Sequence, residues 1–193
     1  MAVEPVARRV RNSREQVRRH LQVAEDDGLV LVTMGGVQER TIPLDRIRTQ
    51  ADRHLVFVVP GDEQGRIVRE DNLLRLPRNS ALYHPDLVAS ADVVIGKVGY
   101  STVAEVYQAA IPFGYTCRQE FPESPPLASF IRSRMEGQEI LEDAFQRGDW
   151  IMQVPELIAR QTAIPPRSNG ADRIAAYVAA LLQESQPAMR SGA

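Results

Sequence analysis

The sequence predicts an α/β fold in which a parallel sheet is covered by helices on both faces. Several short runs, such as 29–33 and 54–59, are continuously apolar and rich in β-branched residues. Strands that are buried on both faces of a sheet have this composition. Helical segments alternate with these runs, and parallel strands need such crossovers. Together these observations predict a Rossmann-like sheet with its ligand crevice beyond the carboxyl ends of the strands.

The composition indicates one globular domain. The chain has 193 residues, of which 44% are hydrophobic and 25% charged, and these values argue against a disordered or low-complexity protein. No stretch approaches the ~20 apolar residues that span a bilayer, and we find no apolar signal segment. A single cysteine, Cys117, cannot form an internal disulfide. We therefore expect a protein of the reducing cytoplasm without a transmembrane segment.

Residues 1–24 are expected to form a linker and a short basic helix. Ser13 and Gln16 have the spacing of a capping box, which predicts a helix to about Leu21 with Val17 and Leu21 facing inward. The first 20 residues carry six arginines against two glutamates, and we expect these arginines on the solvated side. A nucleic-acid-binding arm is the alternative. The net charge of −2 for the whole chain argues against it, so no nucleic acid is expected as a partner.

Residues 25–185 are expected to form the Rossmann-like domain, and residues 186–193 a disordered tail. Strands are predicted at 29–33, 54–59, 73–76, 92–95 and 112–117. Helices are predicted from His84, where proline follows in the first turn, and at 102–110, 126–135, 150–161 and 171–184. The three histidines lie far apart in the sequence and are expected to be structural.

Two strand-to-helix turns carry the chemistry, and the first contains Gly35 and Gly36. Glycines directly after a strand let backbone N–H groups approach a phosphate closely. The dinucleotide fingerprint needs a third glycine, which is missing here, so the pair is a poor match to an NAD site. A turn that needs unusual backbone angles explains the two glycines equally well.

The second turn, at 96–102, is the stronger signal. It contains Lys97, the one lysine among 23 basic residues. The turn is not a Walker loop, because Ala91 stands where that loop has its first glycine and Val98 where it has serine or threonine. This single lysine has two explanations. Its compact ammonium group would suit a tight anion site, or a codon bias that favours arginine left one surface lysine unchanged.

A helix beginning at this turn would present its N-terminus to the crevice. Gly99 would open the helix, and Ser101 and Thr102 would place hydroxyls at its start. Such an end carries roughly half a positive charge and unpaired N–H groups, which suit a diphosphate. Lys97 would add a full charge nearby.

Glu105 has two explanations. Thr102 and Glu105 have the spacing of a capping box, in which the glutamate binds the start of its own helix. A carboxylate at this place could also accept hydrogen bonds from the vicinal hydroxyls of a ribose, as acidic residues do in other nucleotide folds. From the spacing alone we favour the cap at roughly two to one.

Residues 91–105, followed by 110–113, resemble the donor-binding half of GT-B glycosyltransferases of the peptidoglycan N-acetylglucosaminyltransferase type. The likeness is closer still to the glycosyltransferase-like segment that precedes the sugar-kinase domain of L-arabinokinases. It extends over nearly the whole chain and includes Ser13-Arg14-Glu15, Gly35-Gly36, residues 118–130 and Asn169-Gly170-Ala171. The resemblance implies that 25–185 is a single GT-B half that binds a nucleotide sugar, for which we expect a UDP-sugar.

The resemblance also implies roles for individual residues. A diphosphate would be held by the two turns, at Gly35, Gly36, Lys97, Gly99, Tyr100, Ser101 and Thr102. The ribose would be bound by Glu105, so the resemblance favours ribose binding by this residue over a role limited to capping its helix. The donor sugar would meet the segment after the next strand, where the nearest candidates are Arg118, Glu123 and Ser124. Capping of a helix is an equally good explanation for Glu123 and Ser124.

A complete GT-B enzyme has a second Rossmann-like domain that carries the acceptor site and the usual general base. The chain would therefore transfer a hexosyl group only when completed by an acceptor domain, and its own catalytic residues stay unassigned. The alternative is a non-catalytic module that senses a sugar nucleotide or docks a partner enzyme. No cluster has metal-ligand spacing, so neither metal nor cofactor is expected. Cys117 is expected to be a buried, inert thiol.

Overall fold

A computed structural model describes residues 3–34, 42–118, 120–160 and 167–184. Gly35 and Gly36 of the first predicted turn lie outside the described residues, as does the expected tail at 186–193.

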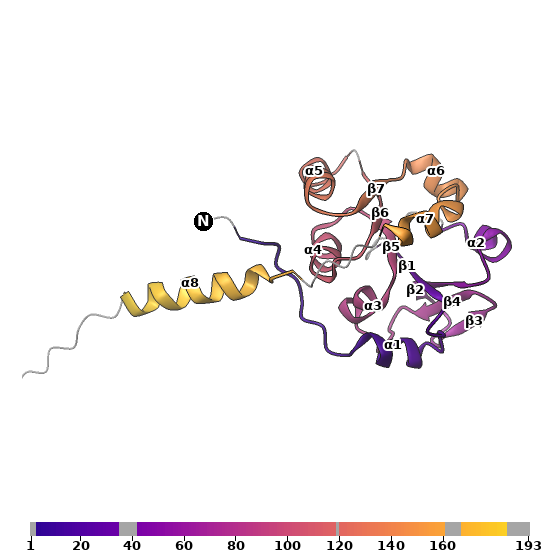
Figure 1. Cartoon of the computed structure of the whole chain (residues 1–193), viewed down its shortest axis with the longest axis horizontal. Coiled ribbons are helices and arrows are strands. Elements are labelled where there is room, and N and C mark those ends of the chain that lie inside the picture. The colour runs from indigo at the N-terminus through magenta and orange to yellow at the C-terminus, as the bar shows by residue number, and fades with distance from the viewer. Residues whose placement is uncertain (1–2, 35–41, 119, 161–166, 185–193) are drawn as a thin grey trace, which may run out of the picture.

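The described residues contain a seven-stranded sheet of order β3-β4-β2-β1-β5-β6-β7 (Figure 1). Neighbouring strands are parallel except for β3 and β4, which are antiparallel. The strands are β1 Gly28–Thr33, β2 Leu55–Asp62, β3 Val68–Glu70, β4 Leu73–Pro77, β5 Val93–Lys97, β6 Phe113–Thr116 and β7 Gly137–Glu139. The predicted Rossmann-like sheet is confirmed. The edge strands β3 and β7 were not predicted, because each has three residues and neither has an apolar run.

The helices are α1 Arg14–His20, α2 Leu44–Gln50, α3 His84–Ser90, α4 Tyr100–Ala109, α5 Ser124–Arg134, α6 Glu142–Arg147, η1 Ile151–Gln153, α7 Val154–Ala159 and α8 Gly170–Glu184. Each predicted helix occurs, although the one expected at 150–161 is divided between η1 and α7. The short helices α2 and α6 were not predicted. Helix α8 leads away from the sheet (Figure 1).

The sheet separates two hydrophobic cores. Alternate side chains of a strand point to opposite faces, so Leu29 and Leu31 enter one core while Val30 and Val32 enter the other. Helices α1, α3, α4 and α5 cover the first face, and α2, α6, η1 and α7 cover the second (Figure 1). In the second core the Trp150 ring stacks on Phe145 at a centroid distance of 5.8 Å. Helices therefore cover both faces, as predicted.

Helix α1 begins with the predicted capping box between Ser13 and Gln16, and Val17 and Leu21 are buried as expected. The expectation that its arginines are all solvated is wrong, because Arg18 is buried. A guanidinium can be buried only where its N–H groups find acceptors. Arg18 donates to Asp92 at 3.1 Å and to the carbonyl oxygens of the loop that follows the helix.

Asp92 thereby joins three elements. Its carboxylate accepts hydrogen bonds from Arg14 at 2.5 Å, from Arg18, and from the backbone N–H of Leu29 at 2.7 Å. Leu29 lies in β1 and Asp92 directly precedes β5, so one mostly buried carboxylate fixes α1 to the start of both central strands.

We predict that Asp92→Ala lowers the free energy of unfolding by about 3 kcal/mol, because it leaves the buried Arg18 guanidinium without its ionic partner. Urea unfolding followed by the fluorescence of Trp150, the single tryptophan, measures the change. Glu156→Ala is the control, since its pair with Arg160 is exposed and its loss should change stability by no more than about 0.5 kcal/mol. Equal effects of the two substitutions would contradict the prediction.

Candidate functional site

The turn between β5 and α4 presents a helix N-terminus at the carboxyl edge of the sheet. Strand β5 ends at Lys97 and α4 begins at Tyr100, with Gly99 as the N-cap residue in an extended conformation. A Cβ atom placed on Gly99 would meet no atom of the described residues within 4 Å. Neither the packing of the described residues nor the backbone angle therefore requires glycine at this position.

Gly96, in contrast, is determined by the sheet. It pairs with Thr33 of β1, and a Cβ atom on Gly96 would lie 2.1 Å from the Thr33 carbonyl oxygen. Essentially no side chain can be accommodated at that separation, so this glycine serves the close approach of β5 to β1.

The capping box expected between Thr102 and Glu105 is wrong. Because α4 begins at Tyr100, both residues lie inside the helix, and within the described residues no side-chain hydrogen bond caps its N-terminus. Tyr100 and Ser101 are exposed on the first turn, and the Tyr100 hydroxyl accepts a hydrogen bond from the Val6 N–H at 3.1 Å. The sequence placed these residues correctly near a helix start but placed that start two residues too late.

Glu105 is the centre of a buried polar network. Its side chain is 3% exposed, and its Oε2 lies 2.7 Å from Nδ1 of His84. The other ring nitrogen of His84 lies 3.2 Å from the Thr33 hydroxyl at the end of β1. Arg8 donates a hydrogen bond from Nε to Oε1 of Glu105 at 2.9 Å, and its Nη2 lies 2.8 Å from the same oxygen in an ion pair. The carboxylate therefore connects α4, α3, β1 and the N-terminal segment.

The N-terminal segment at 3–12, expected as a linker, packs against the domain. The Arg11 N–H donates to Asp86 at 2.7 Å, and Asn169 holds the backbone of Ala7 on both its N–H and its carbonyl. The Tyr83 ring contacts the guanidinium groups of both Arg8 and Arg11. Arg8 is brought to Glu105 by these contacts, yet its own side chain is 54% exposed.

Sequence reasoning missed Arg8 and His84 as partners of Glu105. His84 was expected to be structural, and its position before Pro85 predicted a helix start correctly. His84 and Arg8 lie 21 and 97 residues before Glu105 in the sequence, and no local spacing pattern indicates that the fold brings them into contact with it. The two contacts follow from the adjacency of β1 and β5 and from the path of the N-terminal segment.

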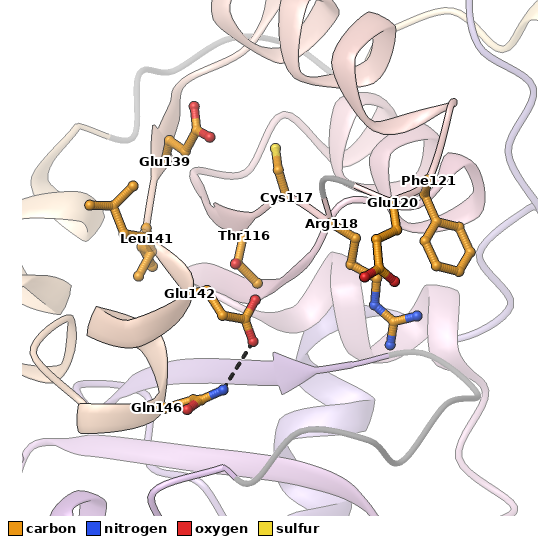
Figure 2. A pocket seen from close by; sticks show the side chains of 10 residues that line it. Thr116, Cys117, Arg118, Glu120, Phe121, Glu139, Leu141, Glu142 and Gln146 are labelled. Carbon is orange, nitrogen blue, oxygen red and sulfur yellow. Dashed lines mark hydrogen bonds between the residues drawn. The ribbon is translucent and has the colours of Figure 1, made fainter.

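The carboxyl edge of the sheet also contains a pocket. A pocket of about 550 Å³ lies beyond the ends of β6 and β7 (Figure 2). It is lined by Thr116, Cys117, Arg118, Glu120, Phe121, Glu139, Ile140, Leu141, Glu142 and Gln146. Burial, and to a smaller extent the nearby Glu139 carboxylate, disfavour the thiolate and together raise the pKa of Cys117 to about 11. Cys117 was expected to be buried, but the structure shows it only partly buried.

The three candidates for sugar binding are separated in the structure. Arg118 lines this pocket and its guanidinium lies 5.0 Å from the centre of the Phe121 ring. Glu123 lines a different, apolar pocket of about 260 Å³ between α4 and α5. Ser124 is buried at the start of α5, and its hydroxyl makes no hydrogen bond within the described residues. Glu123 stands at the N-cap position of α5 but its side chain forms no capping bond.

No family model matches the sequence. An L-arabinokinase of Arabidopsis thaliana is 27% identical over 186 residues, which cover 93% of this chain and 16% of that protein. The chain thus spans about one sixth of this relative's length.

Solved structures share the fold at lower identity. The calicheamicin glycosyltransferase CalG4 is 18% identical with a TM-score of 0.59, over 84% of this chain and 45% of that one. WaaG, a glycosyltransferase of lipopolysaccharide biosynthesis, is 16% identical with a TM-score of 0.52, over 83% and 47%. A Listeria monocytogenes protein described as a UDP-N-acetylglucosamine 2-epimerase is 13% identical with a TM-score of 0.55, over 86% and 48%. The fold is that of one half of a GT-B protein, and the chain spans less than half of each structure.

Among residues 3–34, 42–118, 120–160 and 167–184, no group of three or more histidine, cysteine or acidic side chains is arranged to hold a metal ion. In the same part of the chain no helix combines the length and the apolar character that a membrane span requires.

We predict that Cys117 reacts slowly with iodoacetamide at pH 8. A thiol with a pKa of about 11 has a thiolate fraction about a hundredfold below that of an ordinary cysteine with a pKa near 9. The rate should therefore keep rising with pH through 9 and 10, which mass spectrometry of the single cysteine measures. Glu139→Gln should lower the thiol pKa and speed the reaction at pH 8, whereas Glu120→Gln should not. A rate at pH 8 equal to that of the urea-unfolded chain would contradict the assignment.

Proposed function

We propose that this domain binds a nucleoside diphosphate sugar, specifically a UDP-hexose, and acts as the donor half of a glycosyltransferase. The observation that carries the proposal is the position of Glu105. A carboxylate held by His84 stands beside an open helix N-terminus at the carboxyl edge of a Rossmann-like sheet. This edge is where ligands bind in open α/β sheets. The GT-B fold and the resemblance of 91–105 to donor-binding halves support the same function.

The diphosphate would bind at the start of α4. Its first N–H groups have no partner within the helix, and the helix dipole adds about half a positive charge. One such interaction contributes about 0.3–1 kcal/mol. Several must therefore act together, with the Lys97 ammonium group as the full positive charge at the end of β5. During transfer, this end would stabilise the negative charge that grows on the departing diphosphate.

The ribose would bind to Glu105 in exchange for Arg8. Arg8 is more than half exposed although Glu105 is buried, so the guanidinium group is close to water and is readily hydrated when it leaves the carboxylate. The vicinal hydroxyls of a ribose can therefore replace its hydrogen bonds to the carboxylate at low cost. His84 stays in place, because it also contacts Thr33, and keeps the carboxylate directed to the same position.

Transfer would need an acceptor domain, supplied by another part of a longer chain or by a separate polypeptide. The likeness to an L-arabinokinase over 93% of this chain favours a second candidate, a non-catalytic module that binds the same nucleotide sugar. Both candidates predict nucleotide-sugar binding. They differ in whether the domain supports transfer when an acceptor domain is added.

We predict that UDP and UDP-glucose bind the chain in isothermal titration calorimetry. Glu105→Gln should weaken both by at least about tenfold, because a charge-assisted hydrogen bond contributes about 1.5–3 kcal/mol. Arg8→Ala should bind UDP more tightly than the wild type, because it removes the competing partner. Glu156→Gln, on the exposed face of α7, is the matched control and should bind as the wild type does. No heat from the folded wild type at millimolar UDP would overturn the proposal.

Gly99→Val tests the contact with the diphosphate separately. The described residues leave space for a side chain at Gly99, so the variant should keep the far-ultraviolet circular dichroism and the unfolding midpoint of the wild type to within a few degrees. Its branched side chain would obstruct the start of α4, and we expect at least a tenfold loss of UDP affinity. Unchanged affinity would show that the diphosphate does not lie against this turn.

A further inference from the structure

The order of groups along the carboxyl edge indicates where a donor sugar would lie. Glu105 reaches the end of β1 through His84 and Thr33, and Lys97 ends the neighbouring strand β5. Thr116 at the end of β6 pairs in register with Lys97, and it lines the pocket of about 550 Å³. Adjacent strands lie about 4.8 Å apart. A nucleoside diphosphate sugar with its ribose at Glu105 and its diphosphate at β5 would therefore bring the sugar to the ends of β6 and β7.

We propose that the pocket beyond β6 and β7 holds the donor sugar and selects uncharged sugars over those that carry a carboxylate. This inference rests on the proposed function and adds to it the class of sugar. The site brings together Arg118, the one candidate for sugar binding that lines this pocket, and Glu139, Glu142 and Gln146, which the sequence did not indicate.

The lining groups suit a hydroxyl-rich ring. Figure 2 shows Arg118, Glu120 and Phe121 on one wall and Glu142 with Gln146 on the opposite wall, with Thr116 between them. Carboxylates accept hydrogen bonds from sugar hydroxyls, while guanidinium and amide groups donate to them. The Phe121 ring is 43% exposed and offers an apolar surface for the C–H face of a pyranose. The volume lies within the range of small-molecule sites.

The charges of the lining give the selectivity. Three glutamates, Glu120, Glu139 and Glu142, line the pocket together with one arginine, Arg118. Arg132 lies 3.5 Å from Glu139 and offsets part of its charge. Glu142 accepts a hydrogen bond from the neutral Gln146 side chain at 3.2 Å, which does not change the charge. Counted over these described groups alone, three carboxylates face the two guanidinium groups of Arg118 and Arg132, and this excess of negative charge would repel the carboxylate of a uronic acid.

Calorimetry with UDP, UDP-glucose and UDP-glucuronate tests the inference, because the two sugars differ only in having a hydroxymethyl or a carboxylate group. We expect UDP-glucose to bind at least tenfold more tightly than UDP-glucuronate. The double variant Glu120→Gln, Glu142→Gln should reduce that ratio to threefold or less, because it strengthens the binding of UDP-glucuronate more than that of UDP-glucose. Glu156→Gln should keep the wild-type ratio. Equal affinities of the wild type for the two sugar nucleotides would overturn the selectivity.

Protection of Cys117 locates the sugar without any substitution. The thiol lines the pocket and is the single cysteine of the chain. Saturating UDP-glucose should slow its alkylation by iodoacetamide at pH 9 at least fivefold, whereas saturating UDP should leave the rate unchanged. If UDP-glucose binds but does not protect Cys117, the sugar lies elsewhere and the inference fails while the proposed function stands. If UDP itself does not bind, both fail.

Discussion

Strands β1 and β5 lie together in the middle of the sheet, and their pairing positions Thr33, Lys97 and the start of α4. A side chain at Gly96 would collide with the Thr33 carbonyl, so the pairing of the two strands at this point needs glycine. Asp92 fixes the opposite ends of the strands by accepting the Leu29 N–H. With both ends held, Thr33 and Lys97 reach the same edge, and α4 begins directly beyond it.

A buried carboxylate at that edge follows the ordinary chemistry of buried charge. Glu105 is taken out of water by α4, so it needs hydrogen-bond donors, and it finds them in His84 and Arg8. These two partners differ in exposure. His84 is held by a second contact to Thr33, whereas Arg8 lies on a segment packed across the surface and is largely open to water. A site with one fixed and one exchangeable partner is suited to bind a ligand that supplies hydroxyl groups.

Much of the fold was predictable because its strands are continuously apolar. The runs ending at Thr33, at Val59 and before Lys97 were assigned correctly, and their alternation with helices predicted the parallel sheet. The strands β3 and β7 were missed because their stability comes from pairing to a neighbour rather than from their own composition. The start of α4 was expected at Thr102, where the spacing to Glu105 matches a capping box, but α4 begins at Tyr100 and the Glu105 carboxylate binds His84 and Arg8 instead.

By itself, the sequence determined the class of fold, the two-faced burial of the sheet, the capping box of α1 and the turn at 96–102 as a helix start beyond a strand. These are local properties, set by periodicity, β-branched composition and residue spacing. Only the tertiary structure decided that Arg18 is buried against Asp92, that Arg8 and His84 hold Glu105, and that Arg118 shares a pocket with α6 whereas Glu123 does not. Those contacts join residues far apart in the chain, and their geometry depends on strand order and on the path of the N-terminal segment, which no local pattern encodes.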